Sequence, residues 1–332
     1  MKRIAFFDLE PWEAHYLKRH LRGFKVDGNT SGLTEKNVAQ AKNADAIGVF
    51  IYSPVTDKLL QKLPNVKLVV TLSTGYDHVD LAACRKHKVT VCNVPEYGSN
   101  TVAEHTFALL LSLSRRIPQS AERTKKGDFR LDGLRGFDLA GKTIGIIGLG
   151  RIGQHVARIA QGFDMKILAY DVNGPDLAGI KRVPLKTLLK QSDVVTLHCP
   201  LNDKTHHLIN QKTFKWLKPG AVVINTARGG LIDTEALLKA LYDKRVSAAG
   251  IDVLEEEGAI REEKQLLHRA YQKAGDFKTA LQQHALLAQD NVLITPHNAF
   301  NSQEALQRIL DTTVDNVKAY FQKKPKNVVK NK

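Results

Sequence analysis

Short apolar runs that alternate with amphipathic stretches limit the fold of this chain more than any other feature of its sequence. Trp12–Leu21 and Val79–His87 are two of the amphipathic stretches in the first hundred residues. Strands that alternate with helices form βαβ units and a parallel sheet, and such a sheet binds ligands beyond the carboxyl ends of its strands. The strands predicted in this part are Arg3–Asp8, Ala46–Ile51, Lys67–Ser73 and Val89–Val94.

A second alternating series follows a long predicted helix, Thr101–Arg116, which is apolar around nearly all of its circumference. The segment Glu255–Asp290 interrupts this series with a charged stretch of helical composition, typical of a functional loop or a helical insertion. One amphipathic helix, Ser302–Phe321, is predicted after it. The strands predicted in the second series are Thr143–Ile147, Lys166–Tyr170, Asp193–His198, Ala221–Asn225, Ser247–Ile251 and Val292–Thr295.

The composition is that of a soluble globular protein, with 43% hydrophobic and 25% charged residues in a length of 332 that suits two or three domains. The cysteines Cys84, Cys92 and Cys199 show no CxxC spacing, so neither a disulfide framework nor a zinc ribbon is expected. No stretch reaches the roughly 18 apolar residues of a membrane span, and the first predicted strand leaves no room for a signal peptide. We therefore expect a cytoplasmic protein with no membrane partner.

The charge is strongly positive, with 49 Lys and Arg against 34 Asp and Glu and a formal net charge of +15. Such a surplus attracts nucleic acid, steers small anionic substrates or only keeps a protein soluble. The basic residues are scattered and lack interleaved aromatic residues, which argues against nucleic-acid binding as the main function. Steering of small anions and solubility are the two roles that fit a scattered surplus.

A glycine-rich turn joins a predicted strand to a predicted helix. Gly148, Gly150 and Gly153 have the spacing GxGxxG, which allows a tight turn, a close approach of the backbone to a pyrophosphate, and close packing of helix and strand. The free amides and the positive end of the helix dipole then face the phosphates. Asp171 follows the next strand, 18 residues after Gly153, where a carboxylate binds the adenosine ribose and repels a 2′-phosphate. The pattern predicts NAD as cofactor.

Three later strands each deliver a charged or titratable residue at their carboxyl ends. Arg228 follows the strand that ends at Asn225, Asp252 and Glu257 follow the next, and His297 follows the last. Reduction of a ketone by hydride needs a proton donor, which a protonated imidazole beside a carboxylate provides. An arginine grips an α-carboxylate through two hydrogen bonds and polarises the adjacent carbonyl. A 2-oxo acid is the substrate class that uses all three groups.

With these residues in place, the sequence resembles the D-isomer-specific 2-hydroxyacid dehydrogenases, and within them the NAD-dependent D-lactate dehydrogenases. The resemblance extends over nearly the whole chain. Its motifs are Ser73–Asp80, Thr101–His105, Gly148–Gly153, Asn225–Gly229, Asp252-Val253 and Thr295–His297.

The resemblance implies a role for each catalytic residue. Arg228 binds the substrate, His297 is the acid and base, and Glu257 is the partner of His297. The family spacing selects Glu257, five residues after Asp252, and leaves Glu255 and Glu256 expected to face solvent. The interval between Glu257 and His297 is several residues longer than is usual in the family.

The substrate pocket and the remaining cofactor contacts are also implied by the resemblance. The backbone of Thr74 and Gly75 is expected to hold the substrate carboxylate, while Tyr97, Phe300 and Tyr52 form an aromatic surround that favours pyruvate. For Tyr52, ordinary aromatic packing is an equally good interpretation. Cys199 is expected to be a small apolar spacer and no nucleophile. The further cofactor contacts are Arg151, Ile152, Cys199, Pro200, Thr205, Thr226, Ala227 and Asp252.

The other histidines have structural interpretations. His78 and His105 are expected to be structural or interface residues, and His198 a hydrogen-bonded residue at a strand end. The pair His206-His207 has no acidic or cysteine companion at a metal-ligand spacing in the sequence, so no metal site is expected.

The architecture that the resemblance implies is α/β, with two doubly wound parallel-sheet domains, flavodoxin-like and Rossmann, and the active site in the cleft between them. Residues 1–100 with 298–332 would form the substrate domain and residues 101–297 the NAD-binding domain. The long helix near His105 resembles the dimer interface of the family, so we expect a homodimer.

Three functions remain open at this point. The first is reduction of pyruvate to D-lactate, and the second is action on glyoxylate, hydroxypyruvate or another 2-oxo acid within the same chemistry. The third, of a different class, is an NADH-sensing corepressor-like binding protein, since the family includes such members.

Overall fold

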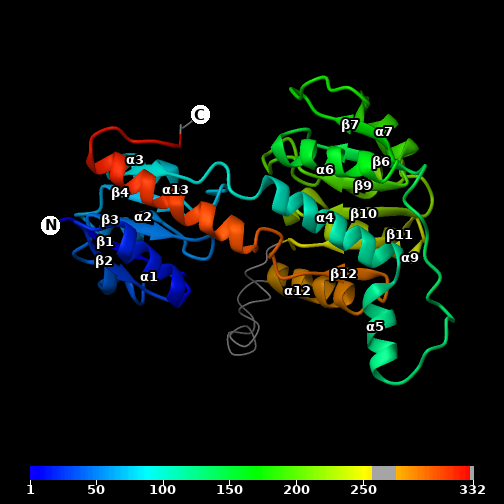
Figure 1. Ribbon diagram of the computed structural model, residues 1–332, viewed down its shortest axis with the longest axis horizontal. Coiled ribbons are helices and arrows are strands. Elements are labelled where there is room, and N and C mark those ends of the chain that lie inside the picture. Colours follow the sequence, from blue (N-terminus) through cyan, green and yellow to red (C-terminus); the bar gives the residue numbers. More distant parts are fainter. Residues whose placement is uncertain (256–273, 330–332) are drawn as a thin grey trace. The chain divides into compact units, whose positions relative to one another are not determined.

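The computed structural model describes residues 1–255 and 274–329, and the side chains of 274–280 are outside this description. The chain divides into two compact units (Figure 1). One is Met1–Gly98 with Ser302–Lys332, and the other is Ser99–Asn301. The chain therefore leaves the first unit once and returns to it for its last helix. The functions predicted for the two domains remain predictions.

The first unit is built on a five-stranded parallel sheet in the order β2-β1-β3-β4-β5, which is the flavodoxin-like order. The three central strands carry mostly buried apolar side chains, because a parallel sheet is covered on both faces; the exceptions are the partly exposed Arg3 and the buried polar Thr71. The strands are β1 (Arg3–Phe6), β2 (Lys25–Gly28), β3 (Ala46–Val49), β4 (Leu68–Thr71) and β5 (Thr90–Cys92).

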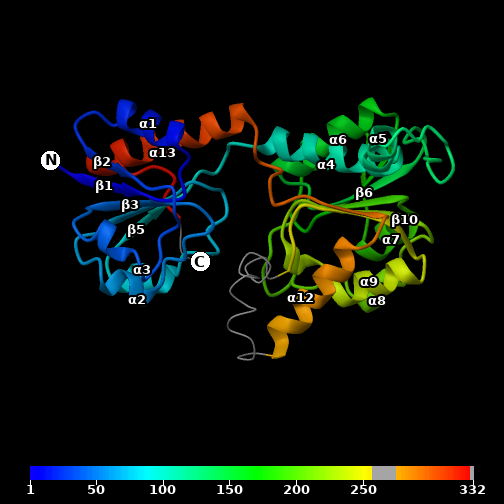
Figure 2. The ribbon, with the colours of Figure 1, turned by 90° about the horizontal axis from the view of Figure 1, so that it is seen from below.

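Helices cover both faces of this sheet, with α1 and α13 on one side and α2 and α3 on the other (Figure 2). Side-chain oxygens cap three of these helices at their first amides: Thr56 caps α2, Asp80 caps α3 and Ser302 caps α13. The bounds are α1 (Pro11–His20), α2 (Asp57–Gln61), α3 (Leu81–Lys86) and α13 (Gln303–Phe321), with a short 3-10 helix, η1 (Val38–Ala41).

The second unit is built on a seven-stranded parallel sheet in the order β12-β11-β10-β9-β6-β7-β8. Taken from its first strand, β6, this is the Rossmann order with one further strand, and it reverses direction between β6 and β9. The strands are β6 (Thr143–Ile147), β7 (Lys166–Tyr170), β8 (Ile180–Arg182), β9 (Val194–Leu197), β10 (Ala221–Asn225), β11 (Val246–Ile251) and β12 (Val292–Ile294).

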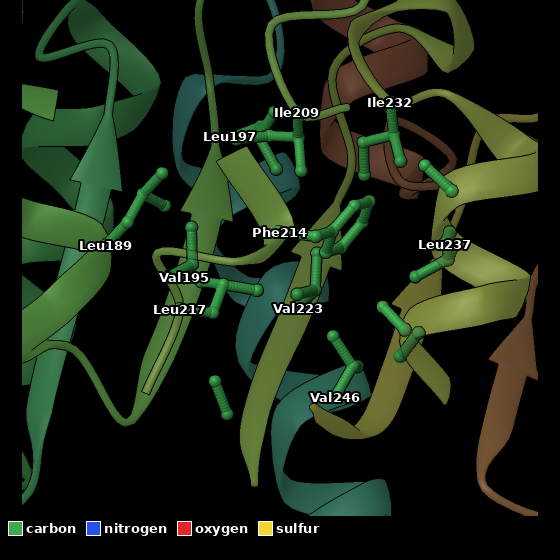
Figure 3. Close-up of a cluster of buried hydrophobic side chains, with 14 of the residues drawn as sticks. Leu189, Val195, Leu197, Ile209, Phe214, Leu217, Val223, Ile232, Leu237 and Val246 are labelled. Atoms are coloured by element: carbon green, nitrogen blue, oxygen red, sulfur yellow. The ribbon is translucent and has the colours of Figure 1, made fainter. Parts of the chain in front are cut away.

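Two helices, α4 and α6, cover one face of this sheet, while α7, α8, α9 and α12 cover the other (Figure 2). The second face carries a core in which Phe214, Val223, Ile232 and Leu237 lie together (Figure 3). The bounds are α4 (Ser99–Ser114), α5 (Ile117–Lys125), α6 (Arg151–Gly162), α7 (Leu185–Gln191), α8 (Gln211–Phe214), η2 (Gly229–Leu231), α9 (Thr234–Tyr242) and α12 (Ala274–Leu287).

The sequence predicted the buried strands and both parallel sheets, and it missed two strands. β2 and β8 each lie at one edge of a sheet, and most of their side chains are partly or fully exposed. Their short sequences, KVDG and IKR, therefore lack the apolar run by which the other strands were found. Among the described residues, no helix is long and apolar enough to cross a membrane.

Truncation of Phe214 tests the core of the second unit. Phe214 is 3% exposed, and we expect Phe214→Ala to lower the free energy of unfolding by about 3–5 kcal/mol, because it removes apolar contacts and leaves a cavity. Tyr242→Ala, at an 88% exposed position on α9, is the control and should change it by less than about 0.5 kcal/mol. Urea unfolding measures both, and equal losses would contradict this description of the core.

Candidate active site

The glycine-rich turn between β6 and α6 has the geometry of a phosphate-binding turn. Gly148 has φ +97°, and a Cβ there would lie 2.6 Å from the backbone nitrogen of Cys199. A Cβ on Gly153 would collide with the carbonyl oxygen of Gly148. Both glycines are therefore required by the packing of the chain itself: one for the turn at the end of β6, the other for the approach of α6.

Gly150 differs from these two glycines, because no contact within the described part of the chain requires a glycine there. Its φ is −69°, and a Cβ there would have no heavy atom of the described residues within 4 Å. Gly150 is also the N-cap residue of α6 and has no side chain to cap the first amides of that helix. The open space and the first amides of α6 therefore fit a dinucleotide pyrophosphate, which needs close backbone approach and amide donors.

Asp171 lies at the end of β7, next to this turn. One carboxylate oxygen accepts a hydrogen bond from the Leu149 amide at 2.6 Å, and the other accepts one from the Asn173 amide at 2.8 Å. These two bonds hold the carboxylate beside the glycine turn, as a ribose-binding acid requires. Arg151 and Ile152 form the first turn of α6 directly after Gly150.

The segment after β9 packs against the glycine turn, with the backbone of His198 and Cys199 next to Gly148. His198 is a hydrogen-bonded strand end, as the sequence predicted, with Nε2 2.8 Å from the Thr196 hydroxyl, and burial lowers its pKa to about 3. Burial raises the pKa of the Cys199 thiol to about 11, which agrees with a spacer and opposes a nucleophile. Pro200 follows, and its carbonyl accepts a hydrogen bond from the Thr205 hydroxyl at 2.7 Å. Thr205 therefore stabilises the loop whether or not it contacts a cofactor.

The turn after β10 carries Arg228. The Asn225 side chain spans this turn, because it donates to the Arg228 carbonyl at 2.9 Å and accepts from the Ala227 amide at 3.1 Å. The Thr226 hydroxyl lies 3.0 Å from that of Thr106 on α4. A Cβ on Gly229 would collide with the Leu254 carbonyl, so the Arg228 turn lies against the segment after β11.

Asp252, directly after β11, holds the turn that carries His297. Its carboxylate accepts hydrogen bonds from the Thr295 hydroxyl at 2.5 Å and from the Asn298 and Ala299 amides at 3.0 Å. His105 on α4 lies 3.5 Å from the same carboxylate and 3.1 Å from the Thr295 hydroxyl. Burial alone would raise the pKa of Asp252, but the hydrogen bonds from His105, Thr295 and the two amides outweigh it and lower the pKa.

His297 lies in a left-handed backbone conformation, with φ +53°, and is half-buried. Its amide donates to the Asp252 carbonyl at 2.9 Å, and the Asp252 amide donates to the Asn225 carbonyl at 2.9 Å. These bonds continue the pairing of β10, β11 and β12 past the strand ends. The turns of Arg228 and His297 thus lie on either side of Asp252 at the carboxyl edge of one sheet. Glu257, predicted as the partner of His297, lies outside the described residues, as does Glu256.

The substrate residues predicted in the first unit lie at the carboxyl edge of its sheet. The Thr74 hydroxyl donates to the Val94 carbonyl at 2.8 Å, and the Ser73 hydroxyl donates to the Gly75 carbonyl at 2.7 Å. Arg308 on α13 donates to the Tyr97 carbonyl at 2.5 Å. Tyr52 is 38% exposed and packs edge-on against Phe50 at 5.4 Å between ring centroids. Phe300, the remaining predicted residue, belongs to the second unit.

Comparison with known proteins shows the family to which the chain belongs. Residues 107–299 match the family described as "D-isomer specific 2-hydroxyacid dehydrogenase, NAD binding domain". The D-lactate dehydrogenase of Escherichia coli strain K12 is 35% identical, over 95% of this chain and 95% of its own length. The glycerate dehydrogenase of Methylorubrum extorquens is 36% identical, over 99% of both chains. The chain belongs to the D-isomer specific 2-hydroxyacid dehydrogenase family.

Solved structures show the same fold. The D-lactate dehydrogenase of Aquifex aeolicus, determined with NAD and lactic acid, superposes with a TM-score of 0.86 at 35% identity, over 97% of this chain and 96% of its own. The prediction of two parallel-sheet α/β domains is therefore confirmed, as is the prediction of an NAD-dependent oxidoreductase acting on 2-oxo and 2-hydroxy acids. The roles of the individual site residues stay predictions.

One expectation for this dehydrogenase was wrong. Glu255, expected to face solvent, is only 20% exposed and bonds to His207 Nε2 at 2.5 Å and to the Thr234 hydroxyl at 2.7 Å. His206-His207 therefore does have an acidic companion, although 48 residues separate His207 from it in the sequence. Only the tertiary fold brings the three side chains together. Burial would raise the pKa of Glu255, but the bonds from His207 and Thr234 outweigh it and lower the pKa.

The Asp252 carboxylate gives the dehydrogenase a pH-dependent contribution to stability. Because the folded-state pKa lies below the ordinary value of 3.8, this contribution is complete above that value and is lost as the pH falls through the folded-state pKa. At pH 7, we expect Asp252→Asn to lower the free energy of unfolding by about 2–3 kcal/mol, since the amide has no charge and one acceptor oxygen instead of two, and its NH2 group would face a donor of the His297 turn.

Urea unfolding at a series of pH values measures this effect. The difference between wild type and Asp252→Asn should shrink below about pH 4, where the unfolded-state carboxyl is protonated. Asp203→Asn, at an exposed position, is the control and should show a small difference at every pH. A difference for Asp252→Asn that stays constant from pH 7 to pH 3 would contradict the assignment.

Proposed function

We propose that this dehydrogenase reduces pyruvate to D-lactate with NADH. The observation that carries the proposal is the pair of turns on either side of Asp252, which place Arg228 and His297 at the carboxyl edge of the NAD-type sheet. The support for pyruvate is the similarity to D-lactate dehydrogenases over nearly the whole chain. NADH supplies the hydride when it is bound.

The residues of this chain would hold the reactants and move the proton. Arg228 would bind the substrate carboxylate through its planar guanidinium and polarise the carbonyl beside it. His297 would donate a proton to the oxygen of that carbonyl as hydride arrives, and Glu257 would keep the imidazole protonated beforehand. Asp252 would keep His297 in place through the turn described above.

The cofactor and substrate would be bound by residues at the strand ends. The turn at Gly148, Gly150 and Gly153 would hold the pyrophosphate on the first amides of α6, and Asp171 would bind the adenosine ribose. The further cofactor residues proposed are Arg151, Ile152, Cys199, Pro200, Thr205, Thr226, Ala227 and Asp252. The substrate residues proposed are Thr74, Gly75, Tyr97, Tyr52 and Phe300.

The similarity to a glycerate dehydrogenase supports hydroxypyruvate or glyoxylate as the alternative substrate. The glycerate dehydrogenase of Methylorubrum extorquens is as similar to this chain as the D-lactate dehydrogenase of Escherichia coli. Hydroxypyruvate and glyoxylate differ from pyruvate only beside the carbonyl, and one pocket side chain can reverse a tenfold preference of about 1.4 kcal/mol.

We further propose that the protein is a cytoplasmic homodimer. The cysteines Cys84, Cys92 and Cys199 are free thiols, which suits a reducing compartment. The α4 segment resembles the dimer interface of the family, and this resemblance supports a homodimer.

A substrate panel tests the proposed function. Steady-state turnover with NADH or NADPH should give a kcat/KM for pyruvate at least tenfold above those for hydroxypyruvate and glyoxylate, and NADH should be preferred because Asp171 repels a 2′-phosphate. Preference for hydroxypyruvate would support the glycerate-type reaction instead. NADH binding without turnover of any 2-oxo acid would support a sensor and overturn the proposal.

Replacement of His297 tests the proton donor. We expect His297→Gln to lower kcat by about 10²–10⁴-fold, since glutamine cannot donate the proton, while the dissociation constant of NADH changes by less than about threefold. Stopped-flow single turnovers and NADH fluorescence titration measure the two quantities. A matching loss of NADH affinity would make His297 a cofactor or structural residue.

A further inference from the structure

A cluster of three potential metal ligands lies where the segments after β9 and β11 approach each other. It consists of His206 and His207, in the segment after β9, and Glu255, after β11. One ligand atom from each residue lies within 4.8 Å of the other two. Neither the proposed reaction nor the cofactor site uses these side chains.

The backbone brings both imidazoles to one side of the chain. Successive side chains of an extended segment point to opposite sides, but His207 has φ +48°, in the left-handed region, and the two rings stack 4.0 Å apart at 24°. Backbone bonds fix this conformation: the His206 amide donates to the Asn202 carbonyl, and the His207 amide to the Gly230 carbonyl, both at 2.8 Å.

The carboxylate is held in place from the opposite side. Glu255 Oε2 accepts a bond from the Thr234 hydroxyl at 2.7 Å, which leaves Oε1 directed at His207 Nε2, 2.5 Å away. A carboxylate ligand oriented by a second hydrogen bond is the usual support of a metal site. Glu255 and His207 are 20% and 34% exposed, and His206 is exposed, so an ion in solution can reach the cluster.

We propose that His206, His207 and Glu255 form a Zn²⁺ site. Two imidazole nitrogens and one carboxylate oxygen are a three-ligand set for zinc, and a water molecule would complete the tetrahedron. At metal–ligand distances of about 2.0–2.1 Å, two ligand atoms of a tetrahedron lie about 3.3 Å apart. His207 and Glu255 therefore need to separate by less than about 1 Å as Zn²⁺ replaces the proton that they share.

Zn²⁺ binding to the full chain, freed of metal by a chelator, tests the proposal. In competition with a chromophoric chelator at pH 7.5, we expect wild type to bind one tight equivalent of Zn²⁺, and His206→Gln to bind it at least tenfold more weakly. His206→Gln is chosen because it spares the bonds of Glu255 to His207 and Thr234. The matched control is His15→Gln, on the exposed surface of α1, which should bind like wild type.

Two further measurements make the result decisive. Co²⁺ should give wild type and His15→Gln the visible absorption of a four-coordinate site, and His206→Gln should lack it. Zn²⁺ should also raise the Tm of wild type more than that of His206→Gln, because a ligand that binds only the folded state stabilises it. A tight equivalent retained by His206→Gln, or no tight equivalent in wild type, would overturn the proposal. None of these readouts depends on the reaction, so this proposal and the proposed function fail separately.

Discussion

Parallel strand pairing is the constraint on which the rest of the second unit depends. Because every strand of the seven-stranded sheet runs the same way, all carboxyl ends meet at one edge, and residues distant in the sequence become neighbours there. The backbone bonds from His297 to Asp252 and from Asp252 to Asn225 extend this pairing into the loops. The loops at this edge are therefore aligned with one another by the same backbone pairing as the strands. The residues placed in this way are Gly148, Asp171, Cys199, Arg228, Asp252 and His297.

Much of the fold could be predicted because the information is local. Strands such as Ala221–Asn225 are continuous buried runs that are apolar up to the last residue. The number and spacing of such runs predict βαβ units from the sequence alone. β2 and β8 could not be found in this way, because an edge strand is paired by its backbone and needs no apolar side chains. Each sheet was thus predicted without the strand at one of its edges.

The same distinction applies to the site: residues within one βαβ unit could be predicted from the sequence, and contacts between distant segments could not. Gly150 and Asp171 could be found because the phosphate turn and its acid lie within one βαβ unit. Glu255 could not be paired with His207, because their contact depends on how β9 and β11 are placed in the sheet. His105 was expected to be structural or at an interface, but its proximity to Asp252 and Thr295 follows only from the packing of α4 against β11. Sequence patterns identify residues that act with their neighbours along the chain.

The bonds of Asp252 also bear on how the specificity of such an enzyme diverges. Its carboxylate ties three backbone or hydroxyl donors of a single turn to the end of β11, and so belongs to the folding of the unit as much as to its chemistry. Changes at this position lower stability before a new activity can be selected. We therefore expect relatives that differ in substrate to vary at exposed positions such as Tyr52. Replacement of this partly exposed ring leaves the packing of the core unchanged.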